Sequence, residues 1–279
     1  MNDVVHLFMR KVTKIPTLPV VAQEIVNLTS DDLISIEKLE SIIENDPAIS
    51  AKILSVSNSV YFGTEIPNTS INNAIVRIGF NNIKNIAIGI ALFTLLIKRN
   101  NSGPLSNSRL FKHSVAVGIV SKMIAELLDF DSGNEIFLCG MLHDIGLLLL
   151  NSYMADTYYP VIKEFKDGIF LCDAEKKVLG YTHSDIGFWL AKQWRLPDNV
   201  KNSVYFHHSP DLTEDKSVSI VHIADYLSSI NSYSVFERAV KHKLDDNALG
   251  LLKLSNNDIR EIEKKIEKDM FSSRVFLYD

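Results

Sequence analysis

Apolar residues recur every three or four positions along most of this chain, which is the spacing that gives an α-helix one buried face. Glycine and proline are scarce, with 12 and 8 among 279 residues, and they fall mostly between the periodic segments. The alternation of apolar and polar residues that marks a half-buried strand is hard to find. The sequence therefore predicts an all-α protein.

Local capping signals mark several helix boundaries. Asp46-Pro47 ends one helix and begins the next, because a proline in the first turn loses no hydrogen bond. Thr182 and Asp185 have the spacing of a capping box, and residues 255–258 repeat it. We predict helices over the ranges 20–28, 36–43, 47–56, 71–78, 83–97, 110–128, 134–153, 158–165, 197–208 and 217–230, and after residues 182 and 255.

The segment 99–108 (RNNSGPLSNS) is the clearest linker in the chain. It separates an N-terminal helical lobe, residues 1–105, from a second helical lobe, residues 106–235, and we assign residues 236–279 to a C-terminal helical extension. The segment Ile86–Ile97 is apolar on all sides, so it must be enclosed by neighbours from both lobes. We therefore expect the two lobes to pack together as one unit.

Charge and composition argue against several classes of protein. With 29 basic and 34 acidic residues the net charge is −5, which gives no general attraction to nucleic acid or to an anionic membrane. The apolar run Ile86–Ile97 is too short to cross a bilayer, and the first residues lack the apolar core of a signal peptide. Cys139 and Cys172 have no CxxC partner, as in reduced cytosolic proteins. We expect a cytoplasmic protein.

Histidines and aspartates of the second lobe follow the order H…HD…H…HH…D. Imidazole and carboxylate are the ligands that bind divalent Fe, Mn, Zn or Ni. Asp144 lies within the apolar stretch MLHDIGLLLL, where a buried carboxylate needs a cation or strong hydrogen-bond donors. We predict a site for one or two divalent metals, formed by His113, His143, Asp144, His183, His207, His208 and Asp225.

Each of these residues has an alternative role, because a single histidine on an apolar face is more often a hydrogen-bonded core residue than a ligand. As a set, the first two histidines with both aspartates would form one ligand group, and the other three histidines would suffice for a second metal bridged by Asp144. His222 could orient a ligand from the same helix face as Asp225. Glu175 and Asp173 could approach the site, although a solvated helix face is the favoured interpretation.

These residues resemble the HD superfamily of metal-dependent phosphohydrolases, whose HDIG motif matches residues 143–146. The three later histidines resemble the extra ligands of the HD-GYP branch, which hydrolyses cyclic di-GMP with two or more metals. The chain is more closely similar to the HDOD family of bacterial signalling proteins, through the segments IPTLPVVAQEIVNL, IIENDPAISAKILSVSNSVYFG, SINNAIVRIGFNNIKNIAI and GYTHSDIGFWLAKQWRLPDNV. This resemblance runs from about residue 15 to about residue 225. It implies a multi-helix fold with an N-terminal lobe packed on an HD-like bundle.

The chain departs from the HD-GYP pattern at three places. Leu147 follows HDIG where those enzymes have a lysine that meets a phosphate, and Ser209-Pro210 follows the histidine pair in place of HHE…GYP. Arg109 stands where a glutamate would bind a third metal. Recognition of cyclic di-GMP is therefore not predicted. The HDOD family is regarded as largely non-catalytic, although this chain keeps all seven candidate ligands.

Two functions stay open at this point. The favoured one is a bacterial regulatory protein of signal transduction, an interaction output module whose metal site is structural or senses a ligand. Its partner would be a signalling protein or a second copy of the chain, with a nucleotide as a candidate ligand and neither nucleic acid nor membrane expected. The alternative is a metal-dependent phosphohydrolase acting on a nucleotide or another phosphoester, with Asp144 as its catalytic residue.

Overall fold

The computed structural model describes residues 17–26, 28, 33–62, 66–97, 103–130, 135–165, 169–236 and 244–270. Every regular element within these residues is a helix, and they contain no strand. The predicted all-α class is therefore confirmed.

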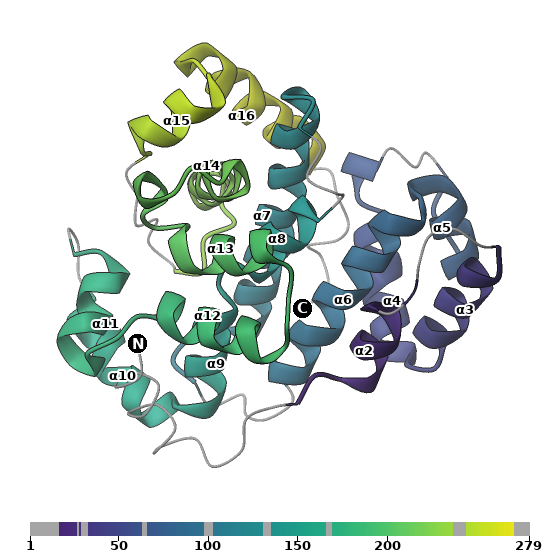
Figure 1. Ribbon diagram of the computed structural model, residues 1–279, viewed down its shortest axis with the longest axis horizontal. Helices are drawn as coiled ribbons and strands as arrows, with labels where there is room; N and C mark the ends of the chain where they lie inside the picture. Colours follow the sequence, from purple (N-terminus) through teal and green to yellow (C-terminus); the bar gives the residue numbers. More distant parts are fainter. Residues whose placement is uncertain are drawn as a thin grey trace.

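The N-terminal lobe, drawn in purple and blue in Figure 1, is a group of short helices that leads into one long helix. Its elements are α2 (Val20–Val26), α3 (Leu33–Glu44), α4 (Pro47–Ser57), η1 (Val60–Phe62), α5 (Ile71–Ile78) and α6 (Phe80–Ile97). The Asp46 carboxylate accepts hydrogen bonds from the amides of Ala48 and Ile49 at 3.0 and 3.1 Å, so the predicted start of α4 is confirmed.

The second lobe packs its helices around α7 and α12. Its elements are α7 (Asn107–Leu127), α8 (Ile136–Leu142), α9 (Ile145–Tyr153), α10 (Ala155–Glu164), α11 (Leu171–Leu179), α12 (His183–Gln193), α13 (Asp198–Phe206), η2 (Pro210–Leu212) and α14 (Lys216–Ile230). Helix α7 contacts α8 and α14, and α12 contacts α9 and α13. This arrangement brings helices that are distant in the sequence around one centre.

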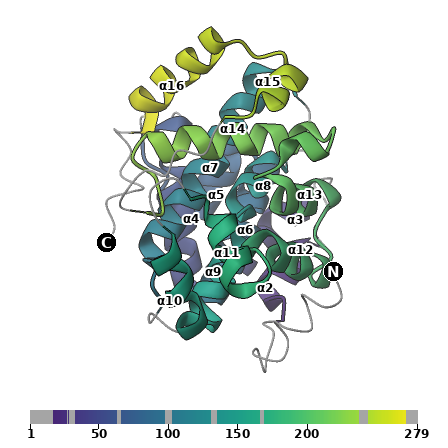
Figure 2. The same cartoon turned by 90° about the vertical axis from the view of Figure 1, so that its left-hand side faces the viewer.

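Two further helices, α15 (Asp246–Leu252) and α16 (Asn256–Met270), lie above α14 in Figure 2. Helix α15 contacts α14, and α16 contacts α7 and η1. The predicted boundary at residue 236 adjoins residues 237–243, which lie outside the described residues, so the division into domains stays a prediction.

Helix α6 joins the two lobes. It contacts α2, α4 and α5 of the first lobe and α8 and α9 of the second, and nearly all of its residues from Ile83 to Leu96 are buried. A helix that is apolar on all sides is stable when neighbours cover all of its sides. Because α6 is covered by helices of both lobes, the expected packing of the lobes against each other is confirmed.

Two stretches, Phe80–Ile97 and Ile136–Tyr153, are long and apolar enough to cross a membrane by length and composition alone. They extend beyond the 12-residue run noticed in the sequence. However, 67% of the first and 94% of the second is buried inside the protein, as in core helices of soluble proteins. This is weak evidence for a membrane span, and the expected cytoplasmic location stays a prediction.

The prediction of one helix over residues 134–153 is wrong, because a turn at His143 and Asp144 separates α8 from α9. Asp144 has φ −98° and ψ 20°, outside the helical range. Successive side chains of a regular helix diverge by about 100°, so the turn lets both residues face the same centre. The predicted linker 99–108 was also too long, since α7 begins at Asn107 and residues 98–102 lie outside the described residues.

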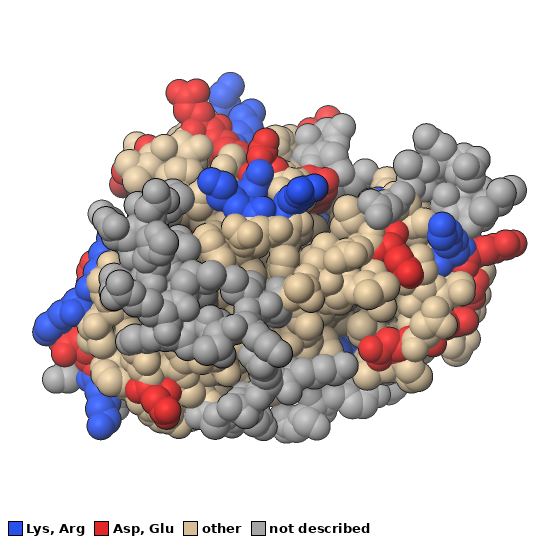
Figure 3. Space-filling model, turned by 60° about the horizontal axis from the view of Figure 1, so that its bottom comes forward, with Lys and Arg blue, Asp and Glu red and all other residues tan. Residues whose placement is uncertain are grey.

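Charged side chains on the face shown in Figure 3 lie mainly around its edges. Much of the described surface between them carries no Lys, Arg, Asp or Glu side chain.

Candidate metal centre

All seven predicted ligands meet at the middle of the second lobe. His113 lies on α7, and His143 and Asp144 lie in the turn between α8 and α9. His183 begins α12, His207 and His208 follow α13, and Asp225 lies on α14. All are buried except His208, which is half-buried. The predicted convergence of these side chains is therefore found, while their role as ligands stays a prediction.

The Asp144 carboxylate stands between two pairs of imidazoles. Its Oδ1 lies 3.3 Å from His183 Nε2 and 3.5 Å from His207 Nε2. Its Oδ2 lies 3.4 Å from His143 Nε2 and 3.7 Å from His113 Nε2. Each oxygen of this one carboxylate is thus directed at a different pair of histidines, so Asp144 belongs to both groups of imidazoles.

We call one group of these side chains the two-histidine half. It consists of His113, His143, Asp225 and the Oδ2 atom of Asp144. Asp225 Oδ1 lies 3.2 Å from His113 Nε2. The Nδ1 of His113 donates to the Tyr233 carbonyl at 2.8 Å, and the Nδ1 of His143 donates to the Gly140 carbonyl at 2.7 Å. Because these bonds place the proton on Nδ1, the lone pair of each Nε2 faces the centre.

The other group, the three-histidine half, consists of His183, His207, His208 and the Oδ1 atom of Asp144. His183 Nε2 lies 3.1 Å from His208 Nε2 and 3.5 Å from His207 Nε2. The Nδ1 of His207 donates to backbone carbonyls of α13 at 3.1 Å. The candidate ligand atoms of this half, with Asp144, all lie within 4.8 Å of one another.

Glu175 on α11 is fully buried behind the three-histidine half, and the interpretation as a solvated residue is wrong. Its Oε2 accepts from His183 Nδ1 at 2.8 Å and from the His183 amide at 2.9 Å, and its Oε1 accepts from Tyr158 at 2.7 Å. A signal was present in the sequence, since Glu175 is four residues after Leu171 on the apolar face of its helix. Asp173 is exposed, as predicted.

The residues of this centre fit a divalent cation. His143 Nε2 is buried and has no hydrogen-bond partner among the described residues. His183 Nε2 and His208 Nε2 lie 3.1 Å apart, so this close pair needs either a proton between the two nitrogens or a cation that both can face. A metal ion resolves both problems at once, because it binds the lone pairs and offsets the Asp144 charge.

The pKa shifts show how strongly the centre attracts positive charge. Burial disfavours imidazolium at His143, but the adjacent Asp144 carboxylate outweighs burial and raises the pKa of His143 to about 9. Burial is likewise outweighed at His183, where Glu175 raises the pKa. At His207 burial prevails and lowers the pKa to about 4. His143 and His183 thus favour added positive charge, which either protons or a metal can supply, whereas His207 favours the neutral ring.

Two glycines bring the halves together. Gly146, the last residue of HDIG, faces α12, where an added Cβ would overlap the His183 carbonyl oxygen. A Cβ at Gly187 would lie 2.7 Å from Val204 and 3.0 Å from the Gly146 amide nitrogen. These contacts allow α9 and α12 to approach closely enough for His183 to reach Asp144. The predicted capping box of Thr182 also fixes the start of α12 and is confirmed.

His222 is a positioning residue. Its Nδ1 donates to the His207 carbonyl at 2.7 Å, and its Nε2 accepts from the Asp245 amide at 3.1 Å. Since both ring nitrogens are used, His222 holds the chain at His207 instead of offering a lone pair to the centre.

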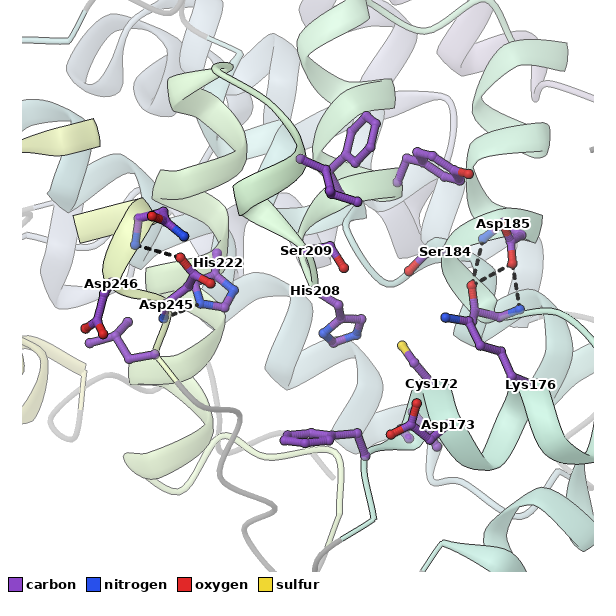
Figure 4. A pocket seen from close by; sticks show the side chains of 18 residues that line it. Cys172, Asp173, Lys176, Ser184, Asp185, His208, Ser209, His222, Asp245 and Asp246 are labelled. Carbon is purple, nitrogen blue, oxygen red and sulfur yellow. Dashed lines mark hydrogen bonds between the residues drawn. The ribbon is translucent and has the colours of Figure 1, made fainter. Parts of the chain in front are cut away.

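A cavity of about 590 Å³ opens beside the three-histidine half and is lined by His208. Figure 4 shows His208 in the middle of this cavity, with the Cys172 sulfur directed toward it. The described charged side chains that line it are one lysine and four aspartates: Lys176, Asp173, Asp185, Asp245 and Asp246. The described lining therefore disfavours an anionic ligand.

The chain is similar to known proteins in sequence and in fold. The sequence profile of the HDOD domain matches residues 15–210. An uncharacterized protein of Treponema pallidum is 24% identical over 203 residues, which are 71% of this chain and 38% of that protein. The chain thus spans well under half of the length of this relative.

Two solved structures share the fold. An HDOD domain protein of unknown function from Geobacter sulfurreducens superposes with a TM-score of 0.81 and 22% identity, covering 99% of this chain and 95% of that one. A proposed phosphohydrolase from Shewanella amazonensis superposes with a TM-score of 0.74 and 21% sequence identity, covering 97% of this chain and 96% of that one. At these identities the likeness concerns the fold, so it carries no activity to this chain.

Proposed function

This chain belongs to the HDOD family, and from that premise we propose that it is a regulatory protein of signal transduction whose metal centre controls a protein-interaction surface. The observation that carries this proposal is the position of α6. On one side α6 contacts α8 and α9, which flank His143 and Asp144, and on the other side it contacts α2, α4 and α5. A change at the centre therefore has a direct packing route to the first lobe.

The centre would hold one or two divalent ions. Neutral imidazoles and carboxylates suit Fe, Mn, Zn or Ni, and the three-histidine half with its extra imidazole favours the softer of these metals. A metal that binds only the folded chain stabilises it and pulls the surrounding helices into one arrangement.

The output surface would lie on the N-terminal lobe. Val20 and Val26 on α2, Ile66, and Val76 on α5 are 67%, 47%, 68% and 73% exposed. Exposed apolar side chains favour association, so the partner would be a signalling protein or a second copy of this chain.

Two features favour a module over an enzyme. Leu147 is buried in the core at the position where the related enzymes have a lysine for a phosphate. The cavity beside His208 is lined by more carboxylates than ammonium groups, which disfavours a phosphoester that approaches from this side.

A binuclear phosphohydrolase is the second candidate, with a nucleotide or another phosphoester as substrate. It is favoured by the placement of the Asp144 oxygens between two histidine pairs and by a cavity that reaches His208. Bound metals would supply a hydroxide near neutral pH by lowering the pKa of a water. Asp144 would then be a catalytic residue that holds both ions.

One set of measurements separates these candidates. Metal analysis of the purified chain gives the ions and their number, and hydrogen exchange with and without chelator tests the link through α6. A module predicts changed protection in α6 and α2 on metal removal, and no hydrolysis of a phosphoester panel with added Mn or Fe. Hydrolysis that disappears in Asp144→Asn but persists in Asp246→Asn, an exposed residue of the cavity beside His208, would establish the enzyme instead.

A further inference from the structure

A second cavity, of about 480 Å³, lies at the N-terminal end of α7 and the C-terminal end of α14. Its described lining consists of Arg109, Lys112, Ser229, Ile230, Ser232, Ser234 and Phe236. The charged side chains in this lining are both cations, in contrast to the acidic cavity beside His208. The lining thus combines two positive charges with hydroxyl groups.

This cavity lies next to the two-histidine half. Arg109 precedes His113 by four residues on α7, and Ser229 follows Asp225 by four residues on α14. Residues four apart share a helix face, and one helical turn rises about 5.4 Å. Because α7 and α14 contact each other, the cavity is about one turn away from the contact between His113 and Asp225.

Hydrogen bonds connect the cavity wall to the candidate ligands. The Ser229 hydroxyl donates to Asp225 Oδ1 at 3.3 Å. His113 Nδ1 donates to the carbonyl of Tyr233, the residue between Ser232 and Ser234. The wall and the two-histidine half therefore share their positioning contacts, and a group bound in the cavity would bear on both.

Ser232 has an unusual backbone. Its φ of 72° lies in the left-handed region, where glycine or asparagine is less strained than serine. A serine at such a position presents a hydroxyl at the cavity wall at some cost in backbone energy. This backbone closes the C-terminal end of α14, where the Tyr233 amide donates to the Ser228 carbonyl at 3.1 Å, and it leaves the Ser232 side chain in the cavity lining.

We propose that this cavity binds the phosphate group of a phosphate monoester. Arg109 and Lys112 match its two negative charges, the hydroxyls of Ser232 and Ser234 can donate to its oxygens, and the remaining volume accepts the organic part of the ester. The role of this ligand as a signal rests on the proposed function. Its binding does not, because binding is measured separately.

The test is calorimetric titration of the full chain with inorganic phosphate and with adenosine monophosphate at constant ionic strength. We expect saturable binding, weakened at least roughly tenfold when Arg109→Gln and Lys112→Gln are combined. The matched control is Arg260→Gln with Lys264→Gln, which removes the same charge from exposed positions of α16 and should leave binding unchanged. Tighter binding of the monophosphate points to an ester as the ligand, and equal binding points to free phosphate, both within the same site.

Ser232→Gly supplies a second test that does not endanger the fold. It relieves the left-handed backbone and removes one hydroxyl, so the variant should melt no lower than the wild type while binding phosphate about threefold more weakly. No saturable binding in the wild type, equal weakening in the α16 control, or full binding in both cavity variants would overturn the proposal. These outcomes are independent of the exchange experiment, which can succeed or fail on its own.

Discussion

The two halves of the metal centre share Asp144 but carry their negative charge in different places. In the two-histidine half, Asp225 contacts His113 directly, and both histidines are oriented by backbone carbonyls. In the three-histidine half, the second carboxylate belongs to Glu175 and stands behind His183. One half thus offers oxygen to a cation, whereas the other uses its carboxylate to make an imidazole more basic.

This difference extends to the surroundings of each half. The three-histidine half adjoins the cavity with four aspartates, and the two-histidine half adjoins the cavity with Arg109 and Lys112. The two cavities share no described lining residue, so a cation and an anion would approach the centre by different cavities. The four predictions that follow test whether the halves are distinct, beginning with the residue that they share.

Asp144→Asn should have the largest effect, because it removes charge from both halves at once. We expect the bound metal to be lost and chelator to have no further effect on the melting temperature. A metal held at 1,000 times its dissociation constant contributes about 4 kcal/mol, and this contribution should disappear. Metal analysis and melting curves measure it, with Asp246→Asn as the exposed control. An identical response to chelator in the wild type and Asp144→Asn would argue that the centre binds no metal.

The sequence predicted which side chains converge at this centre, because their residue types and order were visible in it, while their role as metal ligands stays a prediction. Helix starts such as those at Asp46 and Thr182 were also predictable, because a cap depends on residues within one turn. The turn at His143 and Asp144 that separates α8 from α9 was not predictable, because it depends on the side chains of other helices that these two residues face. Glu175 was assigned to a solvated face although its spacing from Leu171 indicated burial, and its contact with His183 depends on how α11 packs beside α12.

Gly146→Ala should have the second largest effect and should act mainly on the three-histidine half. The added methyl group overlaps the His183 carbonyl, so α9 and α12 must separate, at a cost of roughly 3 kcal/mol. We expect a lower melting temperature and, in a metal titration, loss of the binding contributed by this half alone.

The control for this prediction is Gly250→Ala on α15, where an added methyl group meets nothing within 4 Å. This change should be neutral or stabilising by up to about 1 kcal/mol, as expected for alanine in a helix. Equal destabilisation by both changes would mean that the approach of α9 to α12 is unimportant.

Glu175→Gln should weaken metal binding only in the three-histidine half. The amide keeps the shape of the side chain but removes the charge that makes His183 basic, and such changes typically cost about 10- to 100-fold in metal affinity. The measurement is a metal titration beside Asp173→Asn, which removes an exposed charge from the same helix. Weakening of both halves alike would show that they do not bind independently.

Ser229→Ala should have the smallest effect, and it addresses the two-histidine half. The Ser229 hydroxyl donates to Asp225 at 3.3 Å, so its loss leaves this carboxylate less firmly oriented beside His113. A single hydrogen bond to a charged group is worth about 1.5 to 3 kcal/mol at most, and at this length we expect about 1 kcal/mol, or a fivefold loss of metal affinity. Ser228→Ala is the matched control, because that buried hydroxyl has no hydrogen-bond partner among the described residues. Equal weakening of metal binding in the three-histidine half and the two-histidine half would mean that Asp144 transmits the change. The two halves would then form one cooperative site.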